Sequence, residues 1–448
     1  MTLNQQPREI VSVSPVDNST GLGMFVNSRV LAGTTIYSDT PLVSIQHTAN
    51  RRFVKACQNC HRSLGGMKDQ MSQIFAEDRF AHVDLGLFEI SQSFPIFTCH
   101  CGEMYCSPEC ASEAYKKHHR YLCVAGPFGE AVAEFKYQCL SVEGCGDNLL
   151  LLGQLLAVLE SRSHEDITAF EASIKDLMTY TNRLFEEVAR PPHGQERDAE
   201  WLDWLHTTIL ESFVLLKNAL VPQSKIFSSF FAHESQAYEI CSRILSIFEL
   251  NNIDIAIPTG LESNLKSMYL NTSFRTKFVE ILREKEVVMR ALWSDEARGV
   301  YEDEEEDEEG EEQDDDFEED NETDSEHMHE DGAVDEMLEE IRNEVALVSV
   351  EELLSSECPD FHGTGFYLTV ARTNHSCTPN VVMEFENFNS VVICKSLCEI
   401  EPNSELRMSY ISVPEKKSVK TRQNQLGDYL FVCNCKRCEE EKISIVSS

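Results

Sequence analysis

Apolar and polar residues alternate over short runs near both ends of the chain. Residues 10–48 begin with the alternating run IVSVS, and glycines and a proline then mark turns between short segments. The same pattern returns between residues 363 and 411, in the runs VVMEF, SVVICKSL and ELRMSY. Alternation with a period of two predicts strands that bury one face, so both ends of the chain are expected to be rich in β-structure.

The middle of the chain has a different period. Apolar residues recur every three or four positions in the segments 149–160, 167–188 and 199–220, which is the spacing of one helix face. Further helices are expected at three places: 235–248, 272–292 and 334–347. Strand-rich ends around a long helical region predict an α+β fold.

Length and composition are those of a globular protein. The chain has 448 residues, of which 42% are hydrophobic, enough for two or three domains with at least one sizeable core. The longest apolar stretch, Leu149–Leu159, is interrupted by Gly153 and Gln154 and is shorter than the roughly 20 residues that span a bilayer. The first residues, MTLNQQPREI, contain no apolar core of a secretory signal. We therefore expect a soluble monomer of the cytoplasm, the nucleus or both, with no membrane partner.

The chain is strongly acidic, with a formal net charge of −39. Between Glu302 and Glu326, 19 of 25 residues are acidic and none is Lys or Arg. Removing these 19 charges leaves −20, so the remainder is acidic as well. Such a protein is poorly suited to bind a nucleic-acid backbone, despite the small basic patch Lys116–Arg120, and DNA binding is disfavoured. It is better suited to attract basic proteins.

The acidic run, residues 302–332, is expected to be a solvated and disordered loop. Like charges repel one another there, and few apolar groups are available to form a core. A solubilising linker is the favoured interpretation of such a run. The alternative is recognition, in which the run attracts basic substrates and raises their rate of encounter at low salt.

Cysteines and one histidine form a first candidate metal cluster between residues 57 and 123. The order is Cys57-x2-Cys60, Cys99-x-Cys101, Cys106-x3-Cys110 and His119-x3-Cys123. Zinc takes four sulfur or nitrogen ligands in a tetrahedron, so eight ligands predict two ions. A long intracellular chain with an odd number of cysteines, here 17, uses such clusters for zinc more often than for disulfides. Unliganded core cysteines are the disfavoured alternative.

A second cluster, Cys433-x-Cys435-x2-Cys438, supplies only three local thiols. Zinc needs a fourth ligand, and Cys377 in the sequence NHSC is the natural candidate to supply it. The remaining six cysteines are expected to be structural or incidental: Cys139, Cys145, Cys241, Cys358, Cys394 and Cys398.

Four motifs resemble those of SET-domain methyltransferases and occur in the same order. Gly21-Leu22-Gly23-Met24-Phe25 is similar to the glycine loop that opens the domain. The sequence TNHSCTPN at 373–380 is similar to the NHSCxPN signature, and ELRMSY at 405–410 to the GEELxxxY segment. The stretch 429–438, with its three cysteines, is similar to the post-SET segment. Each motif alone could be a plain turn or a core strand, but the four together are specific.

With a MYND-like finger after the first strands, the chain is identified as a member of the SMYD (SET and MYND domain) family. It is most similar to the short type without the C-terminal helical repeat domain. The implied fold is α+β, with a β-rich SET core split by a MYND double-zinc finger and a large helical insertion. A cysteine-rich post-SET zinc segment follows. The implied domains are 1–50 (N-terminal part of SET), 51–123 (MYND), 124–350 (helical insertion), 351–412 (catalytic SET core) and 413–448 (post-SET).

The resemblance also implies how the metal ligands are shared. In a MYND finger alternate ligand pairs bind the same ion, and the post-SET ion takes one ligand from the NHSC signature. The three implied Zn2+ sites are therefore Cys57, Cys60, Cys106 and Cys110; Cys99, Cys101, His119 and Cys123; and Cys377, Cys433, Cys435 and Cys438. His118 remains an alternative to His119.

The activity that the resemblance implies is methyl transfer from S-adenosyl-L-methionine to a lysine of a basic protein, such as a histone tail or a ribosomal protein. Positioning would supply most of the rate, and an apolar channel would favour the neutral lysine amine. The implied residues fall into three groups. Gly21, Leu22, Gly23, Met24, Asn374, His375, Tyr410 and Phe431 would hold the cofactor; Tyr410 would be the catalytic residue; and Tyr429 and Asn251 would lie along the substrate channel.

Two alternatives from other functional classes remain open. In one, the protein is a catalytically silent adaptor whose MYND finger binds a proline-rich peptide. In the other, it is an acidic binding protein for basic partners. Binding of S-adenosyl-L-methionine would discriminate, because neither alternative requires it.

Overall fold

The computed structural model describes residues 10–17, 21–66, 69–70, 94–142, 144–192, 195–259, 360–414 and 417–447. The helices expected at 272–292 and 334–347, the acidic run at 302–332 and Cys358 lie outside these ranges. The described residues belong to one unit, made by Met1–Leu261 together with Pro359–Ser448. Segments from the two ends of the sequence therefore fold together.

One sheet joins the glycine loop to two of the later motifs. Its strand order is β1 (Val11–Asp17), β2 (Gly21–Val26), β12 (Glu405–Met408) and β9 (Asn374–His375). Strand β12 pairs antiparallel with β2, and parallel with β9, so that Arg407 faces Asn374 and Met408 faces His375. Residues that are more than 350 positions apart in the sequence thus become neighbours.

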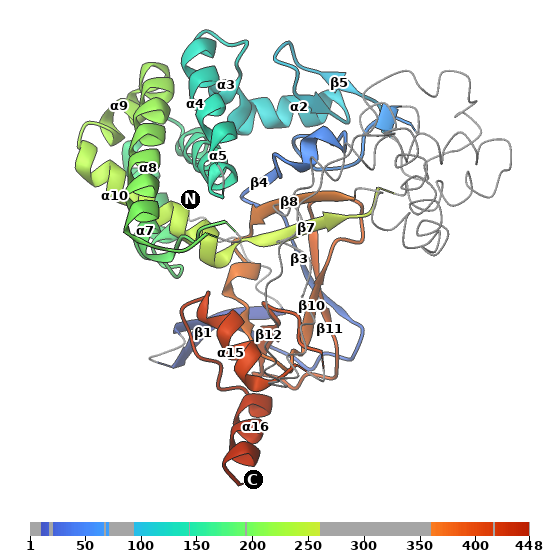
Figure 1. The fold of residues 1–448 in the computed structure, drawn as a ribbon. Coiled ribbons are helices and arrows are strands. Elements are labelled where there is room, and N and C mark those ends of the chain that lie inside the picture. The colour runs from blue at the N-terminus through green and yellow to red at the C-terminus, as the bar shows by residue number, and fades with distance from the viewer. Residues whose placement is uncertain are drawn as a thin grey trace, which may run out of the picture. The chain divides into compact units, whose positions relative to one another are not determined.

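Two further sheets complete the strand-rich region (Figure 1). One has the order β10 (Val381–Glu384), β11 (Val392–Ser396) and β3 (Thr35–Asp39). The other has the order β4 (Val43–Gln46), β8 (Phe361–Phe366) and β7 (Ile253–Ile257), with β7 at an edge. The strands predicted at both ends of the chain are confirmed. Strand β7 lies within 124–350, so β-structure resumes inside the segment that was expected to be helical.

Helices fill the segment between residues 129 and 251 (Figure 1). They are α4 (Gly129–Ser141), α5 (Gly146–Ser163), α6 (Ile167–Leu177), α7 (Phe185–Val188), α8 (Ala199–Leu220), the 3-10 turn η4 (Val221–Gln223), α9 (Lys225–Phe230) and α10 (Glu234–Asn251). Every residue of helix α5 from Leu151 to Glu160 is buried, and the helix contacts α4, α6, α10 and β4, which makes it the centre of this region. The helices predicted over 149–160, 199–220 and 235–248 are confirmed.

The prediction of a single helix over 167–188 is wrong, because α6 ends at Leu177. Polar side chains after that point bind the backbone instead of continuing the helix. The Thr179 hydroxyl donates to the Asp176 carbonyl at 2.6 Å, and the Asn182 amide donates to the Tyr180 carbonyl at 2.8 Å. Such local bonds compete with helix formation. The Tyr180 hydroxyl is then free to donate to the Leu368 carbonyl at 2.7 Å, which ties the helical region to the strand-rich one.

Short elements carry the cysteine clusters. The first cluster lies around the hairpin β5 (Phe97–Thr98) and β6 (Met104–Tyr105), then α2 (Pro108–Ala114), the π-helical turn η3 (Tyr115–His119) and α3 (Arg120–Leu122). The second begins between α15 (Val419–Gly427) and α16 (Lys436–Ser447), with Cys433 and Cys435, and ends in the first turn of α16, with Cys438. Two 3-10 turns, η1 (Asn50–Arg52) and η5 (Val370–Arg372), flank the strand-rich region.

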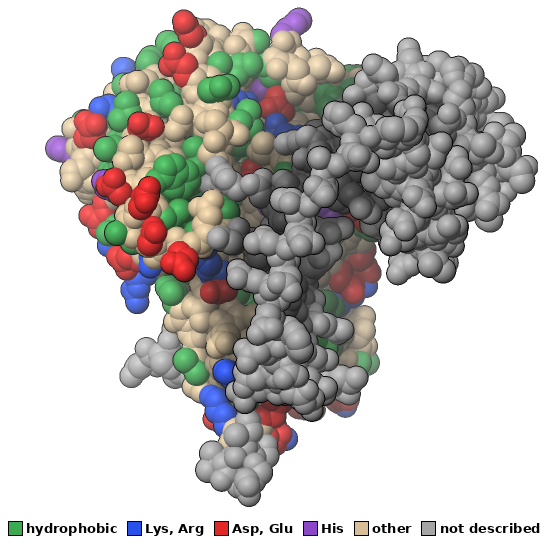
Figure 2. Space-filling view, in the orientation of Figure 1, with side chains coloured by type: hydrophobic (Ala, Val, Ile, Leu, Met, Phe, Trp, Pro, Cys, Tyr) green, Lys and Arg blue, Asp and Glu red, His purple; other side chains and the backbone are tan. Residues whose placement is uncertain are grey.

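The surface of the described residues carries acidic groups outside the acidic run. Figure 2 shows Asp and Glu side chains gathered over the helices α7 and α10. Among them, Glu234 and Glu239 are more than half exposed and pair with Lys217 and Arg243. Among the described helices, none has the length and apolar character to cross a bilayer.

Candidate active site and metal centres

The side chain of Asn374 is fixed against the glycine loop. Its amide donates to the Leu22 carbonyl at 3.2 Å and to Glu405 Oε1 at 2.8 Å. A Cβ atom on Gly23 would lie 3.0 Å from the Asn374 amide and 2.7 Å from Glu405 Oε1, so the contact requires glycine there. Gly21 has a φ of +79°, and Leu22 is partly exposed. Met24 is fully buried, and it pairs with Val13 of β1 on one side and Leu406 of β12 on the other.

His375 connects this sheet with the tyrosine of the ELRMSY motif. Its Nδ1 atom accepts a hydrogen bond from the Tyr410 backbone N–H at 3.0 Å, and its Nε2 atom lies 3.4 Å from Cys377 Sγ. Burial, with Arg407 and Arg422 nearby, lowers the pKa of His375 to about 4, so the ring is neutral at physiological pH. Because Nδ1 accepts, the single ring proton lies on Nε2 and points toward Cys377.

The Tyr410 hydroxyl is buried and held in one direction. It donates to the Thr373 carbonyl at 2.9 Å, and the Tyr37 hydroxyl lies 3.2 Å from Thr373 Oγ1. Burial, followed by the charges of Tyr429 and Glu405, raises the pKa of Tyr410 well above its ordinary value. The hydroxyl therefore stays protonated at neutral pH and can position a group, but it is not a base.

Aromatic rings surround Tyr410. The ring centroid of Tyr429 lies 5.1 Å from that of Tyr410, and the Tyr429 hydroxyl donates to the Tyr410 carbonyl at 3.3 Å. The ring of Phe431 lies 6.2 Å from Tyr410 and 5.8 Å from His375. Three aromatic rings thus lie close together, with Phe431 perpendicular to Tyr410, and their π faces suit a cationic ligand.

A cavity of about 350 Å³ opens beside Tyr410 and Tyr429. Asn251 lines it too, and its amide donates to the Thr181 and Ile247 carbonyls. The structure thus brings together the residues predicted for the substrate channel. The residues predicted only for the cofactor, namely Gly21–Met24, Asn374, His375 and Phe431, do not line this cavity.

Sequence patterns did not single out two polar residues of this cavity, Asn252 and Asp254. They lie just after Asn251, at the junction between α10 and β7. The NNIDI segment, from which Asn251 was predicted to line the channel, could therefore have indicated them as well. The main chain of Thr373, which immediately precedes the NHSC signature, was also missed, although it holds the Tyr410 hydroxyl.

The first cysteine cluster divides into two groups of four ligands. Cys57, Cys60, Cys106 and Cys110 form one group, and Cys99, Cys101, His119 and Cys123 form the other; within each, all ligand atoms lie within 4.8 Å of one another. Ser107 caps α2 by accepting from the Cys110 N–H at 3.1 Å, which fixes the Cys106–Cys110 turn. The turn η3 separates the two histidines, because His119 Nε2 lies 3.4 Å from Cys99 and Cys101 whereas His118 Nε2 meets Gln154.

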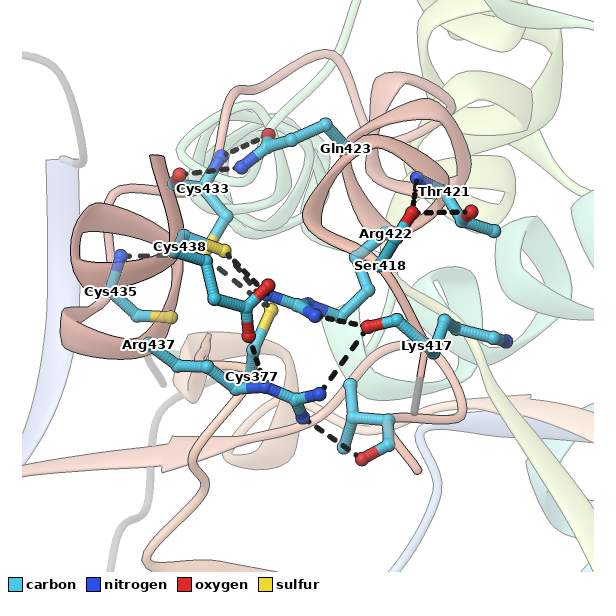
Figure 3. Close-up of polar contacts among 12 residues, drawn as sticks. Cys377, Lys417, Ser418, Thr421, Arg422, Gln423, Cys433, Cys435, Arg437 and Cys438 are labelled. Atoms are coloured by element: carbon cyan, nitrogen blue, oxygen red, sulfur yellow. Dashed lines mark hydrogen bonds and ion pairs between the residues drawn. The ribbon is translucent and has the colours of Figure 1, made fainter. Parts of the chain in front are cut away.

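The third group contains Cys377, Cys433, Cys435 and Cys438, all buried (Figure 3). The N–H and carbonyl of Cys433 bind the Gln423 side chain at 2.9 and 2.7 Å, which anchors the cysteine segment to α15. The Arg422 guanidinium is fully buried and donates to Cys438 Sγ at 3.5 Å and to Glu441 at 3.0 Å. Figure 3 shows this guanidinium pointing into the sulfur cluster.

Sulfur separations match a tetrahedral metal better than disulfides. Zn–S bonds of about 2.3 Å place the sulfur atoms of a tetrahedron roughly 3.8 Å apart. The observed separations are 3.6 Å for Cys60–Cys106, 3.9 Å for Cys99–Cys123, and 3.6 and 4.0 Å from Cys377 to Cys438 and Cys433. A disulfide requires about 2.05 Å. All three groups could therefore hold zinc.

Comparison with known proteins agrees with this geometry. The SET domain family matches residues 21–411, and the chain belongs to that family. The match begins at the glycine loop and ends one residue after Tyr410, so it contains both strands that flank Asn374.

Within the family, the similarity to several members extends over nearly the whole chain. The chain is 22% identical to protein-lysine N-trimethyltransferase SMYD5 of Homo sapiens, over 97% of this chain and 87% of that protein. It is 21% identical to SMYD5 of Danio rerio, over 96% and 86%. It is also 22% identical to histone-lysine N-methyltransferase ATXR2 of Arabidopsis thaliana, over 95% and 89%. The recognition of the SMYD family from the motifs is confirmed.

Proposed function

We propose that this protein is a protein-lysine N-methyltransferase that transfers a methyl group from S-adenosyl-L-methionine to a lysine of a basic protein. The observation that carries the proposal is the position of Tyr410. Its hydroxyl is fixed by the Thr373 carbonyl, and its ring lines the cavity with Tyr429 and Asn251. His375, which follows Asn374, accepts a hydrogen bond from the backbone N–H of the same tyrosine.

The residues present fit S-adenosyl-L-methionine. Its sulfonium is a cation, and the rings of Tyr410, Tyr429 and Phe431 offer negative π faces close together. The Leu22 carbonyl binds the Asn374 amide, and Gly23 permits that approach. When bound, the cofactor supplies an activated methyl group that a neutral amine can attack in line. Gly21, Leu22, Gly23, Met24, Asn374, His375 and Phe431 would hold it.

The protein's own contribution is positioning. Tyr410 keeps its proton, so it acts by orientation and by its dipole rather than as a base. The lysine amine would enter along Tyr429 and Asn251, where apolar neighbours such as Val381 and Met408 disfavour the ammonium form. Holding two reactants in line supplies a large part of the rate in reactions of this kind.

We assign the two metal-bearing segments to a MYND finger, at 51–123, and a post-SET segment, at 413–448. The MYND finger would bind two Zn2+ and the post-SET segment, with Cys377, one. The SET core would then consist of 1–50 and 351–412, with the helical insertion at 124–350. The ligand spacing and the sulfur geometry support this division. The MYND surface could also bind a proline-rich peptide.

A histone tail or a ribosomal protein fits the proposed substrate class, since the chain carries a net charge of −39. The acidic run 302–332 would raise the rate of encounter with such substrates, and its deletion should flatten the salt dependence of turnover. We further propose a monomer that works in the cytoplasm, the nucleus or both.

The test is transfer of labelled methyl from S-adenosyl-L-methionine to total histones and ribosomal proteins. The variant Tyr410→Phe should lose most transfer yet still bind cofactor in calorimetry. The matched control, Tyr137→Phe, changes a tyrosine that is 75% exposed on α4 and should transfer normally. Absence of both transfer and cofactor binding in the wild type would refute the enzyme and favour the adaptor or the acidic binding protein.

A further inference from the structure

Two polar residues of one short segment line the cavity beside Tyr410. Asn252 follows the end of α10 with extended backbone angles, φ −68° and ψ 157°, and Asp254 comes two residues later in β7. Residues two apart in an extended segment lie on the same side. Both line the cavity, together with Tyr429.

The side-chain oxygen of Asn252 is buried and has no hydrogen-bond partner among the described residues. Leaving a buried acceptor unpaired costs about 1–3 kcal/mol. This is unlike the neighbouring Asn251, whose amide makes two bonds to backbone carbonyls. Asn252 itself lines the cavity, so a ligand that turns its side chain can supply the missing donor.

Asp254 is an exposed carboxylate without an ion-pair or hydrogen-bond partner in the described part of the chain. Nearby acidic groups do have partners: Asp428 pairs with Arg190 at 2.8 Å, and Glu249 accepts from Asn148 at 3.0 Å. Asp254 lines the same cavity as Tyr429, and burial and then the charge of Asp254 raise the pKa of that tyrosine. The mouth of the cavity therefore holds an unneutralised negative charge.

We propose that Asn252 and Asp254 form a subsite for the guanidinium of a substrate arginine close in sequence to the target lysine. The proposal rests on the proposed function and adds to it the sequence context of the lysine. A carboxylate and an amide oxygen on one side of a strand can each accept from a guanidinium, whose N–H groups are arranged as a rigid fork. A lysine ammonium would neutralise the Asp254 carboxylate, but it lacks the planar fork of N–H groups that can reach both acceptors at once.

The target lysine itself is not the cation for this subsite. It must become a neutral amine before it can attack, and a carboxylate nearby would stabilise the ammonium form instead. Asp254 is exposed, whereas the Tyr410 hydroxyl is buried, so the carboxylate lies toward the entrance of the cavity. A second cationic residue of the substrate can reach it while the lysine occupies the channel.

The experiment uses a peptide library with a central lysine and one randomised position at a time on either side. Labelled methyl transfer is compared for the wild type, Asp254→Asn, Asp254→Lys and Asn252→Ala. The matched control is Asp203→Asn, an exposed carboxylate on α8. The wild type and the control should favour arginine over a neutral residue by about tenfold at one flanking position. Asp254→Asn and Asn252→Ala should reduce this ratio, and Asp254→Lys should reverse it toward acidic residues.

An unchanged flanking preference in Asp254→Lys overturns the subsite. Failure of the proposed function is recognised separately, as a wild type that transfers methyl to no peptide. In that case the same library is selected by equilibrium binding with S-adenosylhomocysteine present. Retention of arginine-flanked peptides by the wild type, lost in Asp254→Lys, supports the subsite, and equal retention of all peptides by both proteins overturns it.

Discussion

The imidazole of His375 accepts the backbone N–H of Tyr410 at 3.0 Å on one side and meets Cys377 Sγ at 3.4 Å on the other. One ring therefore connects a proposed zinc ligand with the proposed catalytic tyrosine. The hydrogen bond is made by the backbone N–H of Tyr410. It therefore fixes the backbone position of the tyrosine and does not act on its hydroxyl directly. A metal in the third cysteine group would in this way stabilise the active site.

Replacing His375 by alanine should therefore misplace Tyr410. The lost bond leaves the buried Tyr410 N–H unpaired, which costs about 1–3 kcal/mol and corresponds to roughly a ten- to hundredfold loss of methyl transfer. Single-turnover transfer to histones would measure this loss. His233→Ala, an exposed histidine before α10, should behave as the wild type. Equal transfer by the two variants would contradict the role of His375.

Gly23→Ala should abolish cofactor binding without unfolding the protein. The new methyl group would lie 2.5 Å from Val16 Cγ2, 2.7 Å from Glu405 Oε1 and 3.0 Å from the Asn374 amide. The Asn374 side chain must then leave the Leu22 carbonyl that it now binds. Calorimetry with S-adenosyl-L-methionine gives the affinity. Gly427→Ala is the control, because a methyl group there meets nothing within 4 Å. If the two variants bound S-adenosyl-L-methionine with equal affinity, the glycine loop would not hold the cofactor.

Much of the site could be predicted because its chemistry depends on short motifs. Cysteine pairs separated by one to three residues are constrained to approach one ion, whatever the fold around them. The NHSC and ELRMSY motifs include adjacent parallel strands, β9 and β12, so their proximity follows from one sheet. Apolar periodicity sufficed for α5, α8 and α10, which are long and strongly patterned.

What the sequence did not reveal depends on contacts between distant segments. The break after Leu177 is stabilised by Tyr180, whose hydroxyl reaches Leu368 and whose ring stacks on the Arg372 guanidinium at 3.5 Å. Neither partner is near in sequence. Asn252 and Asp254 likewise have no motif of their own, and only the cavity shows that they lie beside Tyr429.

Glu249→Gln should stabilise the protein at neutral pH. Burial, opposed by Arg190 and Asn148 and aided by Asp428, raises the pKa of Glu249. The charged form is therefore less favourable in the folded state, so its cost appears as the pH rises above the ordinary carboxylate pKa and disappears as the pH falls toward it. The gain in Tm for Glu249→Gln should thus be largest at pH 7–8 and shrink toward pH 5.

The control for that measurement is Glu239→Gln on the same helix, where the carboxylate is 56% exposed and pairs with Arg243. An exposed pair of this kind contributes only about 0.3–0.5 kcal/mol, and its removal should lower Tm slightly at neutral pH. A Glu249→Gln variant whose Tm difference from the wild type is the same at every pH would show that Glu249 is not a buried, destabilising charge.

Arg422→Met should loosen the metal of the third cysteine group. Four thiolates and one Zn2+ leave two negative charges in a buried cluster, and the Arg422 guanidinium, itself fully buried, is the cation that touches it. Removing an outer partner of a metal ligand typically costs about 10–100-fold in metal affinity, and Glu441 would also lose its buried partner.

Chelator competition followed by elemental analysis should show one of three zinc ions released much faster from Arg422→Met than from the wild type. The control is Lys436→Met, at the start of α16, the helix that carries Cys438 and Glu441; this side chain is 86% exposed, and the variant should release zinc at the wild-type rate. The same release rate in both variants would mean that the sulfur cluster needs no counter-charge from Arg422.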